Sequence, residues 1–174
     1  MIHFVGAGPG DPELITVRGA SLLARADLVI YAGSLVNPEL LSLCGRDSEK
    51  RNSAEMTLEE VIRAFEEADR EKKEVVRLHT GDPSLYGAIR EQMDALEERG
   101  IPYDVTPGVS SFSGAAAALH AEYTLPGISQ SVILTRLAGR TPVPERESLR
   151  RLSEHGATIV IFLSAGHVEE VQQA

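Results

Sequence analysis

Hydrophobic residues follow two alternating patterns along this chain: short continuous runs, and longer stretches in which they recur every three to four positions. The continuous runs predict β-strands at residues 2–5, 28–31, 75–79 and 103–106. The periodic stretches predict helices at residues 13–26, 38–43, 84–99 and 110–120, and a further helix that opens at Thr57. Strands that alternate with helices are typical of an α/β fold, so we expect a mostly parallel sheet in this part of the chain.

The helical period breaks at the segment AEYTLPG, residues 121–127, which contains Pro126 and Gly127. Beyond the break, strands are predicted at residues 131–135 and 158–163, with a helix at residues 146–154 and a last helical fragment. We therefore expect two domains, residues 1–120 and residues 121–174. Because a unit of about 50 residues buries little apolar surface by itself, the second α/β domain is expected to be truncated.

The composition favours a cytoplasmic globular protein. The net charge of −9, from 26 acidic and 17 basic residues, opposes the binding of nucleic acid or anionic lipid over most of the surface. No apolar stretch approaches the roughly 20 residues that a membrane span requires, and the first residues lack the basic flank of a signal peptide. The single cysteine, Cys44, has no partner for a disulfide, and no Cys/His cluster has metal-ligand spacing. We expect Cys44 to be a buried helix residue and expect no metal site.

Three glycine-containing loops follow three of the predicted strands. They are GAGPGD at residues 6–11, HTGDPSLYG at residues 79–87 and TPGVSS at residues 106–111. Each alone has a purely structural explanation, either a tight turn or the capping of the next helix by Asp82 or a serine. Because open α/β sheets bind ligands at the carboxyl ends of their strands, the three loops together predict one ligand site.

Several common ligand motifs do not match these loops. A dinucleotide fingerprint needs a third glycine where Asp11 stands, and an acidic residue at the end of the second strand, which is missing. The Gly-Lys-Ser/Thr of a P-loop does not occur in them. The segment GVSSF, which starts at Gly108, lacks the final glycine of the hydrolase motif G-x-S-x-G.

Longer segments that contain these loops resemble a known family. They are VGAGPGDPELITVRGASLLARADLVIYAGSLVNPELL, TGDPSLYGAIREQMDALEERGIPYDVTPGVSSF and LPGISQSVILTRLAGRTPVPE. They are similar to the tetrapyrrole methyltransferases of corrin biosynthesis, over essentially the whole chain. The resemblance implies a two-domain α/β fold, a homodimer, and S-adenosylmethionine bound in the cleft between the domains. It also implies methyl transfer to a ring carbon of a precorrin or cobalt-precorrin. Family members continue past residue 174, which is a second reason to expect a truncated second domain.

The resemblance also implies which residues contact the ligands. The matching cofactor positions are Pro9, Thr80, Gly81, Asp82, Leu85, Ser110, Ser111 and Leu163. The segment YAGSLVNPELL, residues 31–41, is expected to shape the macrocycle pocket through Tyr31, Gly33 and Ser34. For Leu163 the alternative is a core position in a strand. Methyl transfer from a sulfonium mainly requires alignment and exclusion of water, so no catalytic acid or base is assigned.

A basic segment stands out against the acidic chain. Residues 136–151 hold five arginines and two glutamates. Since a tetrapyrrole with acetate and propionate arms is a polyanion, we expect Arg136 and Arg140 to bind its carboxylates. The other three arginines, Arg146, Arg150 and Arg151, are equally well explained as the solvated face of a helix.

Three alternatives to this function remain open on the sequence. The first is a methyltransferase of the same family that acts at another ring position. The second is a truncated remnant that binds ligands without turnover. The third is a dinucleotide-binding oxidoreductase, which shares the α/β layout but whose fingerprint is incomplete here.

Overall fold

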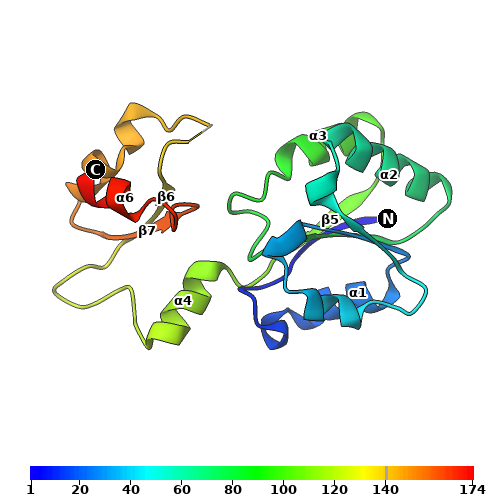
Figure 1. Cartoon of the computed structure of the whole chain (residues 1–174), viewed down its shortest axis with the longest axis horizontal. Helices are drawn as coiled ribbons and strands as arrows, with labels where there is room; N and C mark the ends of the chain where they lie inside the picture. Colours follow the sequence, from blue (N-terminus) through cyan, green and yellow to red (C-terminus); the bar gives the residue numbers. More distant parts are fainter. Residues whose placement is uncertain (140) are drawn as a thin grey trace. The chain divides into compact units, whose positions relative to one another are not determined.

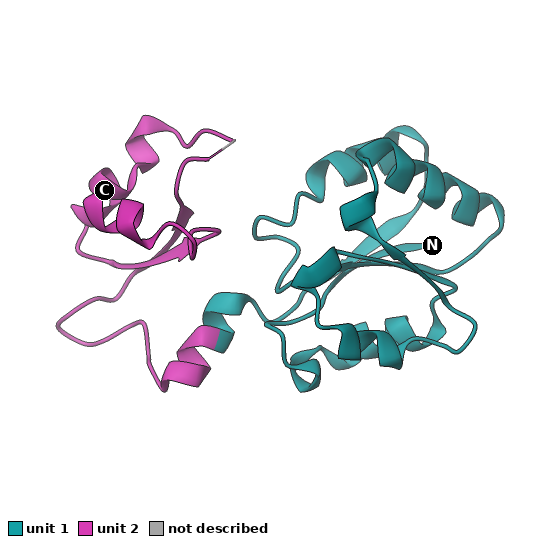
Figure 2. Cartoon of the chain, in the orientation of Figure 1, with its two compact units in different colours: residues 1–114 teal, residues 115–174 magenta. Residues whose placement is uncertain are grey.

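The computed structural model describes residues 1–139 and 141–174. The chain divides into two compact units, Met1–Gly114 and Ala115–Ala174, coloured separately in Figure 2.

The first unit is built from five strands, three α-helices and several short 3₁₀ turns, in addition to the start of α4 (Figure 1). Its strands are β1 (Ile2–Gly6), β2 (Leu28–Tyr31), β3 (Glu49–Asn52), β4 (Val75–His79) and β5 (Tyr103–Thr106). Its helices are α1 (Val17–Arg25), α2 (Leu58–Arg70) and α3 (Arg90–Glu98), with the 3₁₀ turns η1 (Pro12–Leu14), η2 (Gly33–Leu35), η3 (Pro38–Leu43) and η4 (Ser53–Glu55). The α/β fold predicted from the sequence is confirmed.

The strands form one sheet in the order β3-β2-β4-β1-β5, and every neighbouring pair is parallel. Four of the five strands coincide with the predicted runs to within one residue. The fifth, β3, has the sequence EKRN and was not predicted, because it contains no hydrophobic residue. It lies at the edge of the sheet, where charged side chains discourage pairing with another chain.

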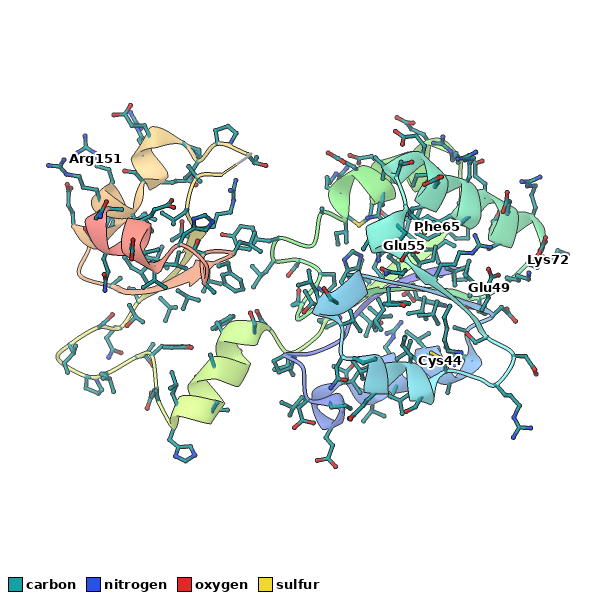
Figure 3. All side chains as sticks on the ribbon, in the orientation of Figure 1. Cys44, Glu49, Glu55, Phe65, Lys72 and Arg151 are labelled. Atoms are coloured by element: carbon teal, nitrogen blue, oxygen red, sulfur yellow. The ribbon has the colours of Figure 1, made fainter. Side chains whose placement is uncertain are left out.

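Two hydrophobic cores cover the two faces of this sheet. On one face, α2 and α3 pack Phe65 and Leu96 against β1, β2 and β4. On the other face, α1 and η3 pack Leu23 and Leu40 against the same strands. Figure 3 labels Phe65 in the first core and Cys44 beside the second. Cys44 is half-buried and follows a 3₁₀ turn, so the prediction of a buried helix residue is wrong.

Two predicted helices of the first unit are shorter in the structure. Residues 13–26 divide into η1 and α1, because Thr16 caps a new helix by accepting a hydrogen bond from the backbone N–H of Gly19. Residues 84–99 form a helix only from Arg90, and residues 83–89 are an irregular loop. The helix opened by Thr57 is confirmed, and Thr57 and Glu60 form a reciprocal capping box there.

The second unit contains most of α4 (Ser111–Leu119), followed by β6 (Val132–Arg136), η5 (Glu145–Glu147), α5 (Leu149–Ser153), β7 (Thr158–Phe162) and α6 (Val168–Gln173). Strands β6 and β7 pair in parallel, with Ile133 opposite Ile159 and Leu134 opposite Val160. All residues of β7 are only half-buried. The predicted helix at residues 146–154 is reduced to α5 after a 3₁₀ turn.

Two features are absent from the described residues. None of their helices is both long and apolar enough to cross a membrane. Among the same residues, no group of three or more His, Cys, Asp or Glu side chains is placed to hold a metal ion.

Candidate functional site

The loops after β1, β2, β4 and β5 gather at one edge of the first unit's sheet, because all these strands are parallel. After β1 the chain passes to α1 on one face of the sheet, whereas after β4 it passes to α3 on the other face. Strands β1 and β4 are neighbours in the sheet. Such a switch between adjacent strands opens a crevice at their carboxyl ends, which is where α/β proteins bind ligands.

Glycines allow the three loops predicted as one site to touch through their backbones. A β-carbon on Gly108 would lie 2.1 Å from the carbonyl oxygen of Gly81, and one on Gly6 would lie 2.6 Å from the α-carbon of Gly108. Gly8 and Gly81 exchange two backbone hydrogen bonds, of 3.2 Å and 2.9 Å. No other residue type fits this junction. The structure therefore brings the three loops together.

Asp82 joins the second loop to the third. One carboxylate oxygen accepts a hydrogen bond from the backbone N–H of Gly108 at 2.9 Å. The other oxygen accepts bonds from the backbone N–H and the hydroxyl of Ser84. Burial raises the pKa of Asp82, but these hydrogen bonds outweigh it and hold the pKa below its usual value. No helix starts at Ser84, so the helix-capping explanation of Asp82 is wrong.

The segment at residues 31–41 is tied to the first loop. The side-chain amide of Asn37 donates to the carbonyl oxygen of Gly10 at 2.8 Å, and its oxygen caps η3 at the N–H of Glu39. Gly33 is buried, with a φ of 58°, and a β-carbon there would lie 3.0 Å from that of Ala54. Gly33 and Asn37 thus fit the segment YAGSLVNPELL between the first loop and the turn after β3.

The remaining predicted site residues of the first unit lie in the loops at this edge. Thr80 and Ser111 are exposed, Leu85 and Tyr31 are half-buried, and Ser34 is exposed beside the buried Gly33. Ser110 is buried at the start of α4, and Pro9 packs beside Gly114 of that helix, where a β-carbon would lie 2.6 Å from the β-carbon of Pro9.

Two buried side-chain atoms at the ends of the strands have no hydrogen-bond partner among the described residues. They are Nε2 of His79, at the end of β4, and Oγ1 of Thr106, at the end of β5. Buried polar atoms are normally paired, so each is a candidate contact for a bound ligand. The sequence did not single out either residue, because each is simply the last residue of a predicted strand.

The remaining predicted site residues belong to the second unit. Leu163 follows β7 with a φ of 57° and is 74% exposed, so the alternative of a core strand position is wrong. The guanidinium of Arg136 donates to the carbonyl oxygens of Leu137, Thr141 and Pro142, and so braces the loop after β6. Arg140 lies outside the described residues. Arg151 projects from α5 and is exposed (Figure 3).

Sequence reasoning also missed the turn after β3. The hydroxyl of Ser53 donates to the carbonyl oxygen of Tyr31 at 3.0 Å, and Asn52 caps η4 at the N–H of Ala54. This turn therefore contacts the backbone of Tyr31 and packs beside Gly33. The sequence feature that could have predicted this turn is the pair Asn52-Ser53, because both residue types favour turns and caps.

Comparison with known proteins places these loops in a known family. A family model of the tetrapyrrole (corrin/porphyrin) methylases matches residues 1–174. The cobalt-precorrin-4 C(11)-methyltransferase of Methanocaldococcus jannaschii is 54% identical over 170 residues, which are 98% of this chain and 66% of that protein.

Solved structures agree with the sequence match. A structure described as a cobalamin biosynthetic enzyme, cobalt precorrin-4 methyltransferase, has a TM-score of 0.95 and 49% identity, over 99% of this chain and 72% of that one. A uroporphyrin-III C-methyl transferase from Thermus thermophilus, complexed with S-adenosyl homocysteine, has a TM-score of 0.74 and 27% identity, over 99% of this chain and 71% of that one.

Proposed function

This chain belongs to the tetrapyrrole (corrin/porphyrin) methylases, and we propose that the protein transfers a methyl group from S-adenosylmethionine to C(11) of precorrin-4 or cobalt-precorrin-4. The observation that carries the proposal is the 54% identity to a cobalt-precorrin-4 C(11)-methyltransferase over 98% of this chain. The match covers 170 residues, so it is not confined to a single motif. The reaction would be a step of cobalamin biosynthesis.

The residues at this edge suit S-adenosylmethionine. Ribose and the amino acid group need polar partners, which the exposed hydroxyls of Thr80 and Ser111 and the unpaired atoms of His79 and Thr106 offer. Leu85 offers an apolar contact for adenine. We place Pro9, Gly81, Asp82 and Ser110 in the same cofactor site. Leu163 is proposed as a cofactor contact on the family resemblance alone.

Alignment is the main chemical task of this site. Bound S-adenosylmethionine supplies a methyl group already activated on a sulfonium. The protein has to hold the macrocycle in line with that methyl group and exclude water. We propose that Tyr31, Gly33 and Ser34 line the macrocycle side, and that Arg136 and Arg140 act on the carboxylate arms. Because Arg136 already donates to the carbonyl oxygens of Leu137, Thr141 and Pro142, its contribution includes shaping the backbone after β6.

The direct test combines binding and turnover. Titration calorimetry with S-adenosylhomocysteine should give saturable binding at one site per chain. Incubation with S-adenosylmethionine and cobalt-precorrin-4 or precorrin-4 should add the mass of one methyl group, located at C(11) by NMR. Methylation at another carbon would favour a different position within the same family, and binding without turnover would favour a remnant. Binding of NADH in place of S-adenosylhomocysteine would overturn the proposal.

The Asp82→Ala variant should bind S-adenosylhomocysteine more weakly by about 1 to 3 kcal/mol. The expected cause is loss of the carboxylate that joins the N–H of Ser84 to the N–H of Gly108, which holds two loops of the site together. Calorimetry on the folded variant measures the effect. Asp47→Ala removes an exposed carboxylate with the same change of charge and serves as the control. Equal affinities of the two variants would contradict the assignment of Asp82.

We also propose that the protein acts as a homodimer in the cytoplasm. Three large apolar side chains, at the end of α4 and in the segment that leads to β6, are exposed, namely Leu119, Leu125 and Ile128. Exposed apolar groups of this kind mark surfaces that associate. Sedimentation equilibrium measures the assembly, and a strictly monomeric mass at micromolar concentration would contradict it.

A further inference from the structure

Arg77 is a buried cation in the middle of the first unit's sheet. It lies on β4, between β2 and β1, and is only 7% exposed. Burial lowers the pKa of Arg77 to about 10, so it remains charged at neutral pH. Among the described residues, no acidic side chain forms an ion pair with it. A buried charge without a counter-charge is unfavourable, so this one calls for an explanation other than stability.

The guanidinium of Arg77 joins two elements that carry loops of the site. Its Nη1 donates to the carbonyl oxygen of Ile30 at 3.2 Å, and its Nε donates to Oε1 of Gln92 at 3.3 Å. Gln92 lies in the first turn of α3 and is also buried. Its amide nitrogen donates in turn to the carbonyl oxygen of Ala88 at 3.1 Å. A continuous polar bridge therefore runs from β2 through β4 and α3 to the loop at residues 83–89.

That loop has a conformation which needs external support. Tyr86 and Ala88 both have left-handed backbones, with φ values of 57° and 49°. Between them, Gly87 is so close to the preceding turn that a β-carbon would lie 2.2 Å from the carbonyl oxygen of Pro83. Residues other than glycine adopt left-handed conformations only where their surroundings impose them, and such conformations concentrate at ligand sites. The contact from Gln92 to Ala88 is such a constraint.

We propose that Arg77 and Gln92 are positioning residues, which hold the strained loop at residues 83–89 in register with the segment after β2 for ligand binding. The inference rests on the proposed function, because Leu85 in this loop is assigned to the cofactor and Tyr31, next to Ile30, to the macrocycle. The bridge fixes the loop at residues 83–89 relative to the segment after β2. It does so through groups that are not themselves assigned to either ligand. Ile30, Arg77 and Gln92 are buried, and the whole bridge lies within the first unit.

The Gln92→Glu variant separates the two halves of the bridge. A carboxylate still accepts from Arg77, and supplies the missing counter-charge, but it has no N–H to donate to the carbonyl oxygen of Ala88. We expect the midpoint of chemical unfolding to stay unchanged or to rise. We expect the amide hydrogens of residues 84–89 to exchange about tenfold faster, the change that follows from loss of one buried hydrogen bond. The dissociation constant for S-adenosylhomocysteine should rise by a similar factor.

The Gln172→Glu variant makes the same chemical change at an exposed position of α6 and should alter none of the three measurements. As a second test, Arg77→Met removes the buried charge and the donor to Gln92. It should also speed exchange at residues 84–89, with a smaller effect on the peptides of α1 and β2. Should Arg77→Met fail to fold, Gln92→Glu still decides.

The outcomes distinguish this inference from the proposed function. Unchanged exchange at residues 84–89 in Gln92→Glu overturns the positioning role. A fall in unfolding midpoint that matches the loss of affinity also overturns it, because it indicates a merely structural role. If the unaltered protein does not bind S-adenosylhomocysteine, the proposed function fails, whereas the exchange measurement still tests whether the bridge holds the loop.

Discussion

The Gly108→Ala variant is expected to lose about 1 to 3 kcal/mol of the free energy of unfolding, the usual cost of forcing extra atoms into a packed site. The added methyl group would lie 2.1 Å from the carbonyl oxygen of Gly81 and close to Gly6. Both neighbours are backbone, so they cannot move aside by changing a rotamer. The loops after β1, β4 and β5 must therefore separate, and the variant should also bind S-adenosylhomocysteine at least tenfold more weakly.

Denaturant unfolding and calorimetry measure these two effects. Gly166→Ala is the matched control, because a β-carbon there has no neighbour within 4 Å and the backbone does not require a positive φ. The control should change neither stability nor affinity. If Gly108→Ala behaved like the control, the description of the three loops as one closely packed junction would be wrong.

The protein is expected to lose stability steeply in mild acid because of His79. Burial, and secondarily the charge of Arg77, lowers the pKa of His79 in the folded state to about 3, from a value of 6.5 for the free group. The unfolded chain therefore takes up a proton more readily than the folded chain does. Below about pH 6.5 each further pH unit should cost about 1.4 kcal/mol, which amounts to about 5 kcal/mol by pH 3.

Chemical denaturation at a series of pH values tests this expectation. The series runs from about pH 7.5 to about pH 4.5, which is the range in which an imidazole titrates. In His79→Gln the side chain does not titrate, so the fall in stability with decreasing pH should be shallower by about 2 kcal/mol at pH 5. His155→Gln, at an exposed position, should keep the slope of the unaltered protein. Acidic residues affect all three proteins alike. Identical slopes in all three would show that His79 is not held neutral by the fold.

The sequence was informative wherever the deciding interactions are local. The strand runs at residues 2–5 and 75–79 are hydrophobic because both faces of a parallel sheet are covered, and this pattern is visible without the fold. The capping box of Thr57 and Glu60 involves residues three positions apart. Likewise, the three glycines of the loop after β1 indicate that another group comes close to its backbone. They do not indicate which group that is.

The sequence misled where a local signal was overruled by distant partners. Residues 84–89 have a helix-compatible composition, but Asp82 binds the N–H of Gly108 and Gln92 binds the carbonyl oxygen of Ala88, so the chain there follows another path. Strand β3 is polar throughout and pairs only because β2 offers it an edge. Neither partner can be identified from the residues next to it.

The sequence by itself determined the α/β class, the carboxyl-edge loops and the family, because these depend on periodicity and on motifs of contiguous residues. Only the tertiary structure decided that Gly6, Gly81 and Gly108 meet, that Asp82 serves the backbone and that Leu163 is exposed. It also revealed the buried charge of Arg77 beneath the site. The physical reason is that packing, burial and the pKa of a buried group depend on atoms brought together from distant parts of the chain, and spacing along the chain does not encode those distances.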